Sequence, residues 1–266
     1  MADQKISDLA ALTAITDADL LVVVDVSATE TKKVTKGDLF DGLTVGRGAG
    51  DIATNTASGY QALFTNTTGS MNTASGYQAL YANSTGFNNS ASGYQALWSN
   101  TTGNYNTAHG VQTLRLNTTG TQNTAVGFTT LHNNTTGNNN TGIGFQTLRY
   151  NTTGTGVTAS GLQALFTNTT GNNNTASGFQ ALYNNTTAAD NTGTGFQALF
   201  YNTTGATNTG TGFRALFSNT TGSMNTASGH SSLYSNTTGA GNTASGEDAL
   251  RYNTTGANNT ASGQGA

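Results

Sequence analysis

Apolar and polar positions recur with a period of 17 residues from about residue 55 onward. The stretches Asn55–Met71 and Asn72–Asn88, "NTASGYQALFTNTTGSM" and "NTASGYQALYANSTGFN", show the unit twice. A glycine column begins at Gly59 and keeps its spacing without a slip, and a second column, which begins at Gly69, breaks only at Ala188. Self-similarity at a fixed short period is typical of a solenoid.

One slot of the unit is always leucine, and another is always asparagine. We expect the leucines to stack as a core ladder, which comprises Leu63, Leu80, Leu97, Leu114, Leu131, Leu148, Leu165, Leu182, Leu199, Leu216, Leu233 and Leu250. The asparagine column runs from Asn66 to Asn253 and would stack as an amide ladder. The turn ladder that we expect from these columns includes Asn66, Asn83, Asn100, Gly69, Gly86 and Gly103.

The unit is too short for a helix-turn-helix repeat, and Asn, Thr, Ser and Gly are poor residues for a helix interior. We therefore expect "TASGYQAL" to form one or two short strands, and "NTTG" to form a turn in which Asn and Gly take positive φ. Each unit would be one coil, hydrogen-bonded to the next about 4.8 Å along the axis. The sequence predicts an all-β fold, a parallel β-roll or β-helix solenoid of about twelve 17-residue coils.

Two further columns carry large aromatic side chains, and a coil of this size cannot enclose both together with leucine. One column contains Phe64, Tyr81, Trp98, Phe166, Tyr183, Phe200, Phe217 and Tyr234. At least one column must face a partner, and a second copy of the chain is the simplest one, because a continuous apolar stripe marks an interface. The sequence therefore favours a homotrimer, with an interface formed by Tyr60, Tyr77, Tyr94, Phe128, Phe145, Phe179, Phe196 and Phe213.

Residues 1–50 differ in composition from the shaft of repeats, residues 51–266, and we expect a small α+β anchor there. "LLVVVDV" (Leu20–Val26) is typical of a buried strand, and "KKVT" (Lys32–Thr35) would return as a second strand. "KGDLFDGL" (Lys36–Leu43) predicts a short helix, and the glycines of "VGRGAGD" (Val45–Asp51) indicate a flexible joint. A region of this size is marginal for independent folding, so trimerisation or docking would order it.

Composition excludes several classes of protein. The net charge of −3 leaves no basic footprint for nucleic acid, and only 8% of the residues are charged. No apolar run is long enough to insert in a membrane as a helix. The start "MADQKISDL" lacks the pattern of a secretion signal, so we expect synthesis in a cytoplasm. Without Cys there are no disulfides and no thiolate metal sites.

The repeat "NTASGYQALYxNTTGxxNTASG" resembles the shafts of bacteriophage tail fibres, and more loosely the β-roll heads of trimeric autotransporter adhesins. Residues 5–43 ("KISDLAALTAITDADLLVVVDV…") resemble the virion-anchoring start of many phage fibre proteins. The resemblance implies a trimeric fibre in the virion. Its N-terminus would attach to a baseplate, tail or head protein, and its repeats would project toward a host surface glycan or protein. Many such fibres end in a receptor-binding tip or a chaperone, whereas this sequence stops within a coil, at "NTASGQGA". The resemblance then implies either that a chaperone is removed or that a partner covers the end.

The search for chemistry predicts no enzyme, no cofactor and no metal site. Glu247 and Asp248 are adjacent and would point to opposite faces of a strand, whereas glycosidases need two carboxylates that face one bond. His109, His132 and His230 fall in three different slots, so they form no zinc site. The late coils depart from the consensus, and we expect any receptor contact there, at His230, Glu247, Asp248 and Arg251.

Three arginines and a histidine replace aromatic residues in the column that begins at Phe64; they are Arg115, His132, Arg149 and Arg251. An unpaired buried arginine is costly, so this slot must be partly exposed. It is either the rim of an interface, over which the arginine stems lie, or a groove of aromatic and arginine side chains that binds surface sugar.

Three other functions remain open. A cellular adhesin would need an export signal or a membrane anchor. An ice-binding solenoid is suggested by the paired column of Thr67 and Thr68. An open cross-β filament would form if coils of different chains stacked end to end.

Overall fold

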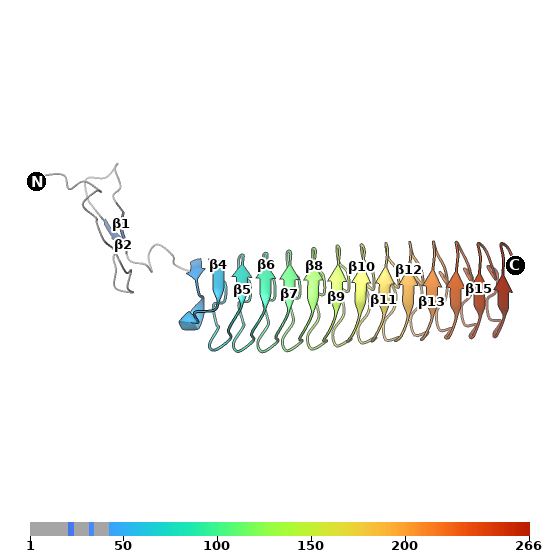
Figure 1. Cartoon of the computed structure of the whole chain (residues 1–266), viewed down its shortest axis with the longest axis horizontal. Helices are drawn as coiled ribbons and strands as arrows, with labels where there is room; N and C mark the ends of the chain where they lie inside the picture. The colour runs from blue at the N-terminus through green and yellow to red at the C-terminus, as the bar shows by residue number, and fades with distance from the viewer. Residues whose placement is uncertain (1–20, 24–31, 35–42) are drawn as a thin grey trace, which may run out of the picture. The chain divides into compact units, whose positions relative to one another are not determined.

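The computed structural model describes residues 21–23, 32–34 and 43–266, with side chains from residue 47 onward. The chain divides into two compact units, Met1–Gly42 and Leu43–Ala266 (Figure 1). In the first unit, β1 (Leu21–Val23) pairs antiparallel with β2 (Lys32–Val34), which confirms the two strands predicted there. The helix expected in residues 36–43 falls outside the described residues, except that Leu43 begins a strand.

The second unit is a β-solenoid, as predicted. Its single sheet has fourteen strands in chain order, from β3 (Leu43–Gly46) to β16. The thirteen strands β4–β16 are parallel and in register, each separated from the next by one 17-residue coil (Figure 1). β4 is Thr56–Tyr60, and β5 to β16 are Thr73–Ser75, Ser90–Ser92, Thr107–His109, Thr124–Val126, Thr141–Ile143, Thr158–Ser160, Thr175–Ser177, Thr192–Thr194, Thr209–Thr211, Thr226–Ser228, Thr243–Ser245 and Thr260–Ser262.

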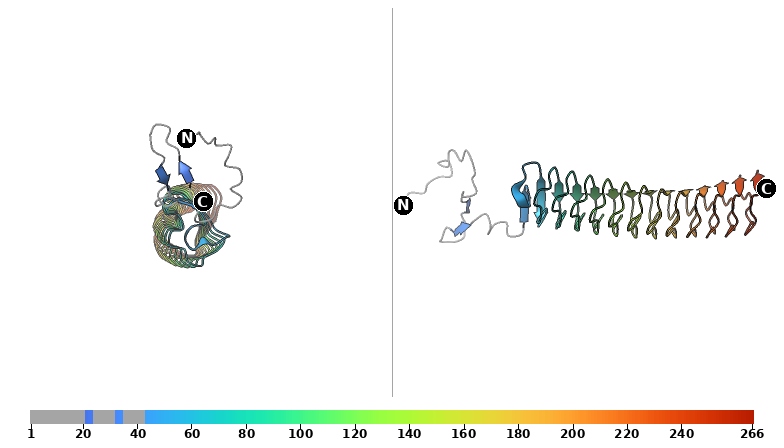
Figure 2. Two further views of the ribbon diagram at one scale, coloured as in Figure 1. Left: turned by 90° about the vertical axis from the view of Figure 1, so that its left-hand side faces the viewer. Right: turned by 90° about the horizontal axis from the view of Figure 1, so that it is seen from below.

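The strand of each coil is shorter than the sequence predicted. After β4 it contains only three residues, most often Thr-Ala-Ser, with the middle residue buried in nearly every coil and the outer two more exposed. The following "GYQAL" segment is a run of turns instead of a strand. In the first coil Ala62 N–H donates to Gly59 O and closes one backbone turn, and Asn66 N–H donates to Leu63 O and closes a second turn that follows it. Viewed along the stack, the coils superpose, with the strands on one side (Figure 2).

Positive φ lies in other slots than expected. The Asn66 and Gly69 columns do not have it, whereas Gly59 (φ 140°), Gln61 (φ 53°) and Leu63 (φ 50°) do, as do their equivalents in later coils. Left-handed φ costs a side-chain-bearing residue about 1–2 kcal/mol. Hydrogen bonds between coils offset this cost. Residues with positive and negative φ alternate in this segment, and the alternation turns the peptide N–H and C=O groups along the axis, toward the neighbouring coils. Leu63 N–H, for example, donates to Ala79 O of the next coil at 3.0 Å.

The core is thin and consists of small residues around the leucine column. Leu63 to Leu233 are 0% exposed, as are many of the alanines one slot before, such as Ala62 and Ala79. Leu250 packs against this core but is only partly buried. The leucines therefore form the predicted core ladder, and the alanine or glycine at the middle of each strand lets the coil close over them.

Two buried asparagine ladders hold successive coils together. In the ladder that starts at Asn66, the amide of Asn83 donates to Asn66 Oδ1 at 2.8 Å and to Gly86 O at 2.9 Å, and the pattern continues to Asn253. A second ladder, which sequence analysis missed, starts at Asn55. There Asn72 N–H donates to Asn55 Oδ1 at 2.8 Å. Buried amides are stable only when they are bonded in this way, so each ladder fixes the register of the coils.

The "NTTG" segment bends the chain where the sequence predicted a turn, and its first threonine has a structural role. In the first coil, the N–H groups of Thr67, Thr68 and Gly69 all converge on the carbonyl of Ser84 in the next coil. The Thr67 hydroxyl donates to the same carbonyl at 2.9 Å. Most equivalent hydroxyls are bonded in the same way, for example Thr118 to Thr135 O. This row of hydroxyls therefore holds the coils together, and its O–H groups already donate to protein carbonyls.

The segment expected to be a flexible joint is instead a cap on the first coil. β3 pairs antiparallel with β4, and η2 (Ala49–Asp51) covers the end of the core. Ala49 N–H donates to Leu63 O at 3.0 Å, and a Cβ on Gly48 would lie only 2.6 Å from Leu63 Cβ. The shaft therefore begins at Leu43 instead of residue 51, because residues 43–51 satisfy a sheet edge that would otherwise be unpaired.

Candidate functional site

Three neighbouring columns form one surface along the shaft, which we call the aromatic face. The first, the tyrosine–phenylalanine column, is the set proposed as a trimer interface: Tyr60, Tyr77, Tyr94, Phe128, Phe145, Phe179, Phe196 and Phe213. These side chains are 38–46% exposed. The second, the mixed column, runs from Phe64 to Arg251 and includes the four basic substitutions. The third, the glutamine column, begins at Gln61.

The glutamine column lies between the two aromatic ones. Gln78 Nε2 donates to Gln61 Oε1 at 2.9 Å, and this ladder continues to Gln112, breaks at Thr129 and resumes from Gln146 to Gln197. Arg214 occupies the next slot of this column. Its guanidinium lies 5.2 Å from the ring of Phe213 on one side and 5.1 Å from the ring of Phe217 on the other. The three columns are therefore continuous as a surface.

The rings of the tyrosine–phenylalanine column stack on one another along the axis. Neighbouring centroids lie 5.0–5.3 Å apart with interplanar angles of 5–12°. Val111 and Leu162 interrupt the stack. Because ring faces contact neighbouring rings, the edges are what the column presents outward. This geometry disfavours sugars that stack on ring faces, and it favours packing against another apolar surface.

The basic residues of the mixed column are half-buried, in agreement with the partial exposure that the sequence required. Arg115 donates from Nε to Gln95 Oε1 at 3.0 Å, and its guanidinium lies 5.0 Å from the ring centroid of Trp98. The Arg149 guanidinium lies 5.6 Å from the ring of Tyr150. Both cations are thus positioned by uncharged neighbours.

His132 lies in the coil between these two arginines. Burial lowers the pKa of its imidazole below the usual 6.5, and the positive charges of Arg115 and Arg149 lower the pKa further. The hydrogen bond with Asn133, 2.6 Å from Nδ1 to Oδ1, opposes both effects on the pKa. The two arginines make this strip of the surface locally positive, on a shaft with few charges.

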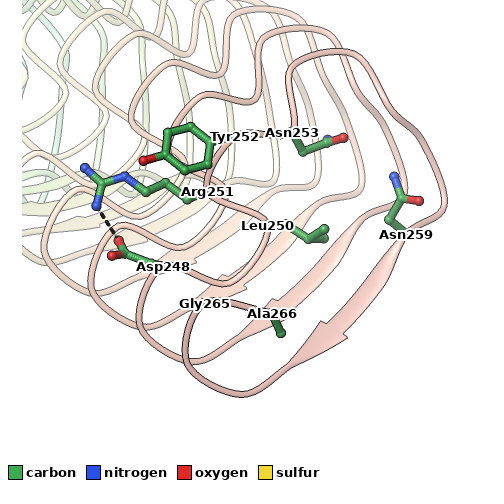
Figure 3. Close-up of a pocket in the computed structure, with 8 residues that line it drawn as sticks. All are labelled: Asp248, Leu250, Arg251, Tyr252, Asn253, Asn259, Gly265 and Ala266. Carbon is green, nitrogen blue, oxygen red and sulfur yellow. Dashed lines mark hydrogen bonds and ion pairs between the residues drawn. The ribbon is translucent and has the colours of Figure 1, made fainter.

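The four residues proposed for receptor contact all lie on the aromatic face, in its last coils. His230 stacks on Phe213 at 5.0 Å and continues that column, and Glu247 follows it one coil later. Asp248 lies in the glutamine column and pairs with Arg251 of the mixed column at 2.7 Å (Figure 3). The prediction that Glu247 and Asp248 point to opposite faces of a strand is wrong, because this segment is a turn.

A hollow of about 510 Å³ adjoins this pair, lined by Asp248, Leu250, Arg251, Tyr252, Asn253, Asn259, Gly265 and Ala266 (Figure 3). It lies at the last coil, where Leu250 and Asn253 have no full coil beyond them in this chain. Their counterparts in earlier coils are covered by the next coil. The hollow is therefore the open end of the stack, and nothing in its lining forms a built binding site.

The strands present a second regular surface, the hydroxyl face. Its two rows begin at Thr56 and Ser58 and repeat in every strand up to Thr260 and Ser262. Within the shaft that the structure describes, no hydroxyl of these rows donates to another protein group. The face carries no carboxylate, lysine or arginine, and three coils replace the serine with His109, Val126 or Ile143.

Among residues 21–23, 32–34 and 43–266, no three His, Cys, Asp or Glu side chains gather as they would around a metal ion. The same described parts contain no helix that is long and apolar enough to cross a bilayer. No protein-family model, curated protein or solved structure matches the chain.

Sequence analysis identified the aromatic columns and the leucine core, but it missed the glutamine ladder and the Asn55 ladder. The signal for both was present, since Asn recurs in its slot with one exception, Val157, and Gln occupies its slot in most coils. What the repeat could not indicate was that the glutamine lies between the aromatic columns, because this depends on the run of left-handed residues in the turn.

Proposed function

We propose that this protein is a structural fibre of a bacteriophage virion, which projects or forms the device that recognises the host. The observation that carries the proposal is the aromatic face, an apolar surface repeated along an otherwise uniform and weakly charged solenoid. A shaft without metal clusters or paired carboxylates in its described part fits a mechanical role. The resemblance of the repeat and of residues 5–43 to phage fibres supports the same role.

In this proposal the fibre is a homotrimer, and the tyrosine–phenylalanine column forms the contact between chains. Ring edges 38–46% exposed would be buried there. A parallel, in-register trimer would bring the same coil of each chain to the same level, so each stack of rings would meet its own copies. Burial of apolar surface contributes about 25 cal/mol per Å², so a column of many coils can hold chains together even though each coil contributes little.

Residues 1–42 would attach the fibre to a baseplate, tail or head protein, and the shaft would face a host glycan or protein. This arrangement places the chain in the virion after synthesis in the host cytoplasm. The separate N-terminal unit supports such a division of roles, because the shaft has its own cap and does not need residues 1–42 to complete its first coil.

The mass of the purified full chain in solution, measured by light scattering, tests the trimer. We expect three chains, and a single chain once Phe179, Phe196 and Phe213 are changed to lysine. The matched control changes Thr175, Thr192 and Thr209 on the hydroxyl face to lysine and should leave the mass at three chains. A monomeric wild-type protein would remove the interface from the proposal.

The fibre role is tested by immunogold electron microscopy with antibodies raised against residues 43–266. The virus particles are purified from samples in which the gene is present. Antibody label on projections of these particles would support the proposal. Label on the envelope of cells, with unlabelled particles, would instead identify an adhesin.

A second candidate function is ice binding, for which the hydroxyl face is a better candidate surface than the threonine column named from the sequence. The Thr67 hydroxyls are bonded to the next coil, so that column is unsuited to the role. The hydroxyl face is better suited, because two rows of hydroxyls without protein partners recur at strand spacing, about 4.8 Å. Thermal hysteresis of the purified protein, lost when Thr158 and Thr175 are changed to lysine, would favour this function over a fibre.

A further inference from the structure

Three consecutive coils in the middle of the shaft, which we call the variant block (residues 107–150), depart together from the consensus. The core alanine slot holds Thr113, Thr130 and Thr147, whereas every other coil has alanine or, once, Ser232. The same coils carry Arg115, His132 and Arg149 in the mixed column, and His109, Val126 and Ile143 on the strand. Departures shared by three columns and confined to adjacent coils mark a specialised segment, unlike drift at the ends of an array.

The variant block differs from the other coils in the core as well as on the surface. The buried hydroxyls of Thr130 and Thr147 donate to Gly144 O and Gly161 O, each at 2.5 Å, and that of Thr113 donates to Gly110 O at 3.0 Å. These bonds satisfy polar groups that would be costly to bury alone. The block therefore keeps the coil geometry while it changes the surface.

The charge of the block is uncompensated. Between Asp51 and Asp190 the sequence has no carboxylate side chain. Within the described part of the chain, ion pairs join Arg47 to Asp51 and Arg251 to Asp248, and none involves Arg115 or Arg149. Two permanent cations thus lie two coils apart, about 10 Å at the usual strand spacing, with an imidazole between them.

The cations are held in place before any ligand arrives. Gln95 accepts from Nε of Arg115, and Trp98 lies against its guanidinium, so the terminal N–H groups remain for a partner. Tyr150 lies against the guanidinium of Arg149 in the same way. The guanidinium of arginine offers paired N–H donors that match a carboxylate. Because neighbouring side chains already hold each guanidinium in position, the entropic cost of binding is lower.

We propose that the variant block is a binding site for an acidic polysaccharide, whose chain lies along the shaft and places its carboxylates on Arg115 and Arg149. Uncharged hydrogen-bonding groups surround the cations, namely Gln95, Gln112 and Asn133, and they suit sugar hydroxyls. A nucleic acid fits poorly, because its denser phosphates need a longer basic tract and the chain is acidic overall.

The site remains open in the trimer proposed above, in which Arg115 and Arg149 lie beside the tyrosine–phenylalanine column and not within it. In a parallel, in-register assembly the neighbouring chain presents the same coils, which carry no carboxylate. No copy could therefore neutralise the arginines of another. The site concerns a single chain, so it does not depend on the fibre proposal.

The test measures binding of the full chain to carboxylated polysaccharides (polygalacturonate, alginate and hyaluronate) by isothermal titration at low salt. Neutral dextran and inorganic polyphosphate are the comparison probes. We expect at least one carboxylated polymer to bind, dextran not to bind, and polyphosphate to bind at least about tenfold more weakly. The affinity should fall as salt is added.

The variant R115F/R149F restores the residue type of the other coils, so it should fold, and circular dichroism and thermal melting check this. It should lower the affinity by about tenfold or more. The matched control R214Q removes an arginine of the same face outside the variant block and restores the glutamine of most other coils, so it should change the affinity less than about twofold. The proposal is overturned if no carboxylated polymer binds, if polyphosphate or dextran binds equally well, or if R214Q weakens binding as much as R115F/R149F.

Discussion

The side-chain oxygen of Asn140 accepts a hydrogen bond at 3.0 Å from the backbone N–H of Val157, but Val157 has no amide to continue the ladder to Asn174. In an unbroken coil, Asn123 N–H donates to Asn106 Oδ1 at 3.0 Å. Within the described residues, Asn174 N–H has no such acceptor. The ladder that starts at Asn55 is therefore broken at this one coil.

The substitution V157N should stabilise the shaft by about 1 kcal/mol, the usual net value of a hydrogen bond. The new side-chain oxygen would accept from Asn174 N–H, and the new amide would donate to Gly171 O, as Asn72 does to Gly86 O. Urea unfolding followed by circular dichroism measures the change. The converse substitution N106V, in an unbroken part of the ladder, should destabilise by about 1–3 kcal/mol. Equal effects of the same sign would contradict this account of the ladder.

The two glycine columns should respond differently to alanine. Gly178 has φ 132°, and a Cβ there would lie 2.5 Å from Gly195 O, so G178A should destabilise the shaft by about 1–3 kcal/mol from backbone strain alone. Gly171 has no left-handed φ, and the next coil already has Ala188 in its slot. G171A should therefore cost less than G178A in thermal melting. A Cβ on Gly171 would also meet the carbonyl of Ala188, so the two sites are both crowded and differ in φ. A larger loss from G171A would show that space, and not φ, determines the response to alanine.

The lowered pKa of His132 makes stability depend on pH. The imidazole of His132 binds a proton less readily in the folded state than in the unfolded chain. The contribution of neutral His132 to the free energy of unfolding is therefore fully present above pH 6.5, and it is lost as the pH falls through the lower pKa of the folded state. Urea unfolding between pH 7.5 and 4.5 should show this loss. H132F removes the group and should flatten that part of the profile. An NMR titration of His132 that gave a pKa of 6.5 or above would contradict the prediction.

The same titration reports on the proposed polysaccharide site. The charged groups that face His132 are Arg115 and Arg149, and both lower its pKa. A bound carboxylate would offset their charge, so the pKa of His132 should rise when the acidic polymer is added. His230 lies on Phe213 in another column, outside the proposed site, so its ring signals should not shift when the polymer is added.

Truncation should separate the cap from the N-terminal unit. Removing residues 1–42 leaves β3 and η2 on the first coil and should leave the melting temperature of the shaft nearly unchanged. Removing residues 1–51 exposes Leu63 and the unpaired edge of β4, so the protein should melt earlier and aggregate. Equal behaviour of the two truncations would show that residues 43–51 do not cap the shaft.

The sequence by itself determined the solenoid, its period, its leucine core and the existence of an exposed aromatic surface. It could do so because identical slots in successive coils must share one environment, so a slot that is always Leu is interior and a slot that accepts both Phe and Arg is not. Only the tertiary structure decided the length of the strands, the cap formed by residues 43–51 and the left-handed φ of residues such as Gln61 and Leu63. Local preferences oppose that backbone, and the hydrogen bonds that make it favourable exist only when the next coil is in place.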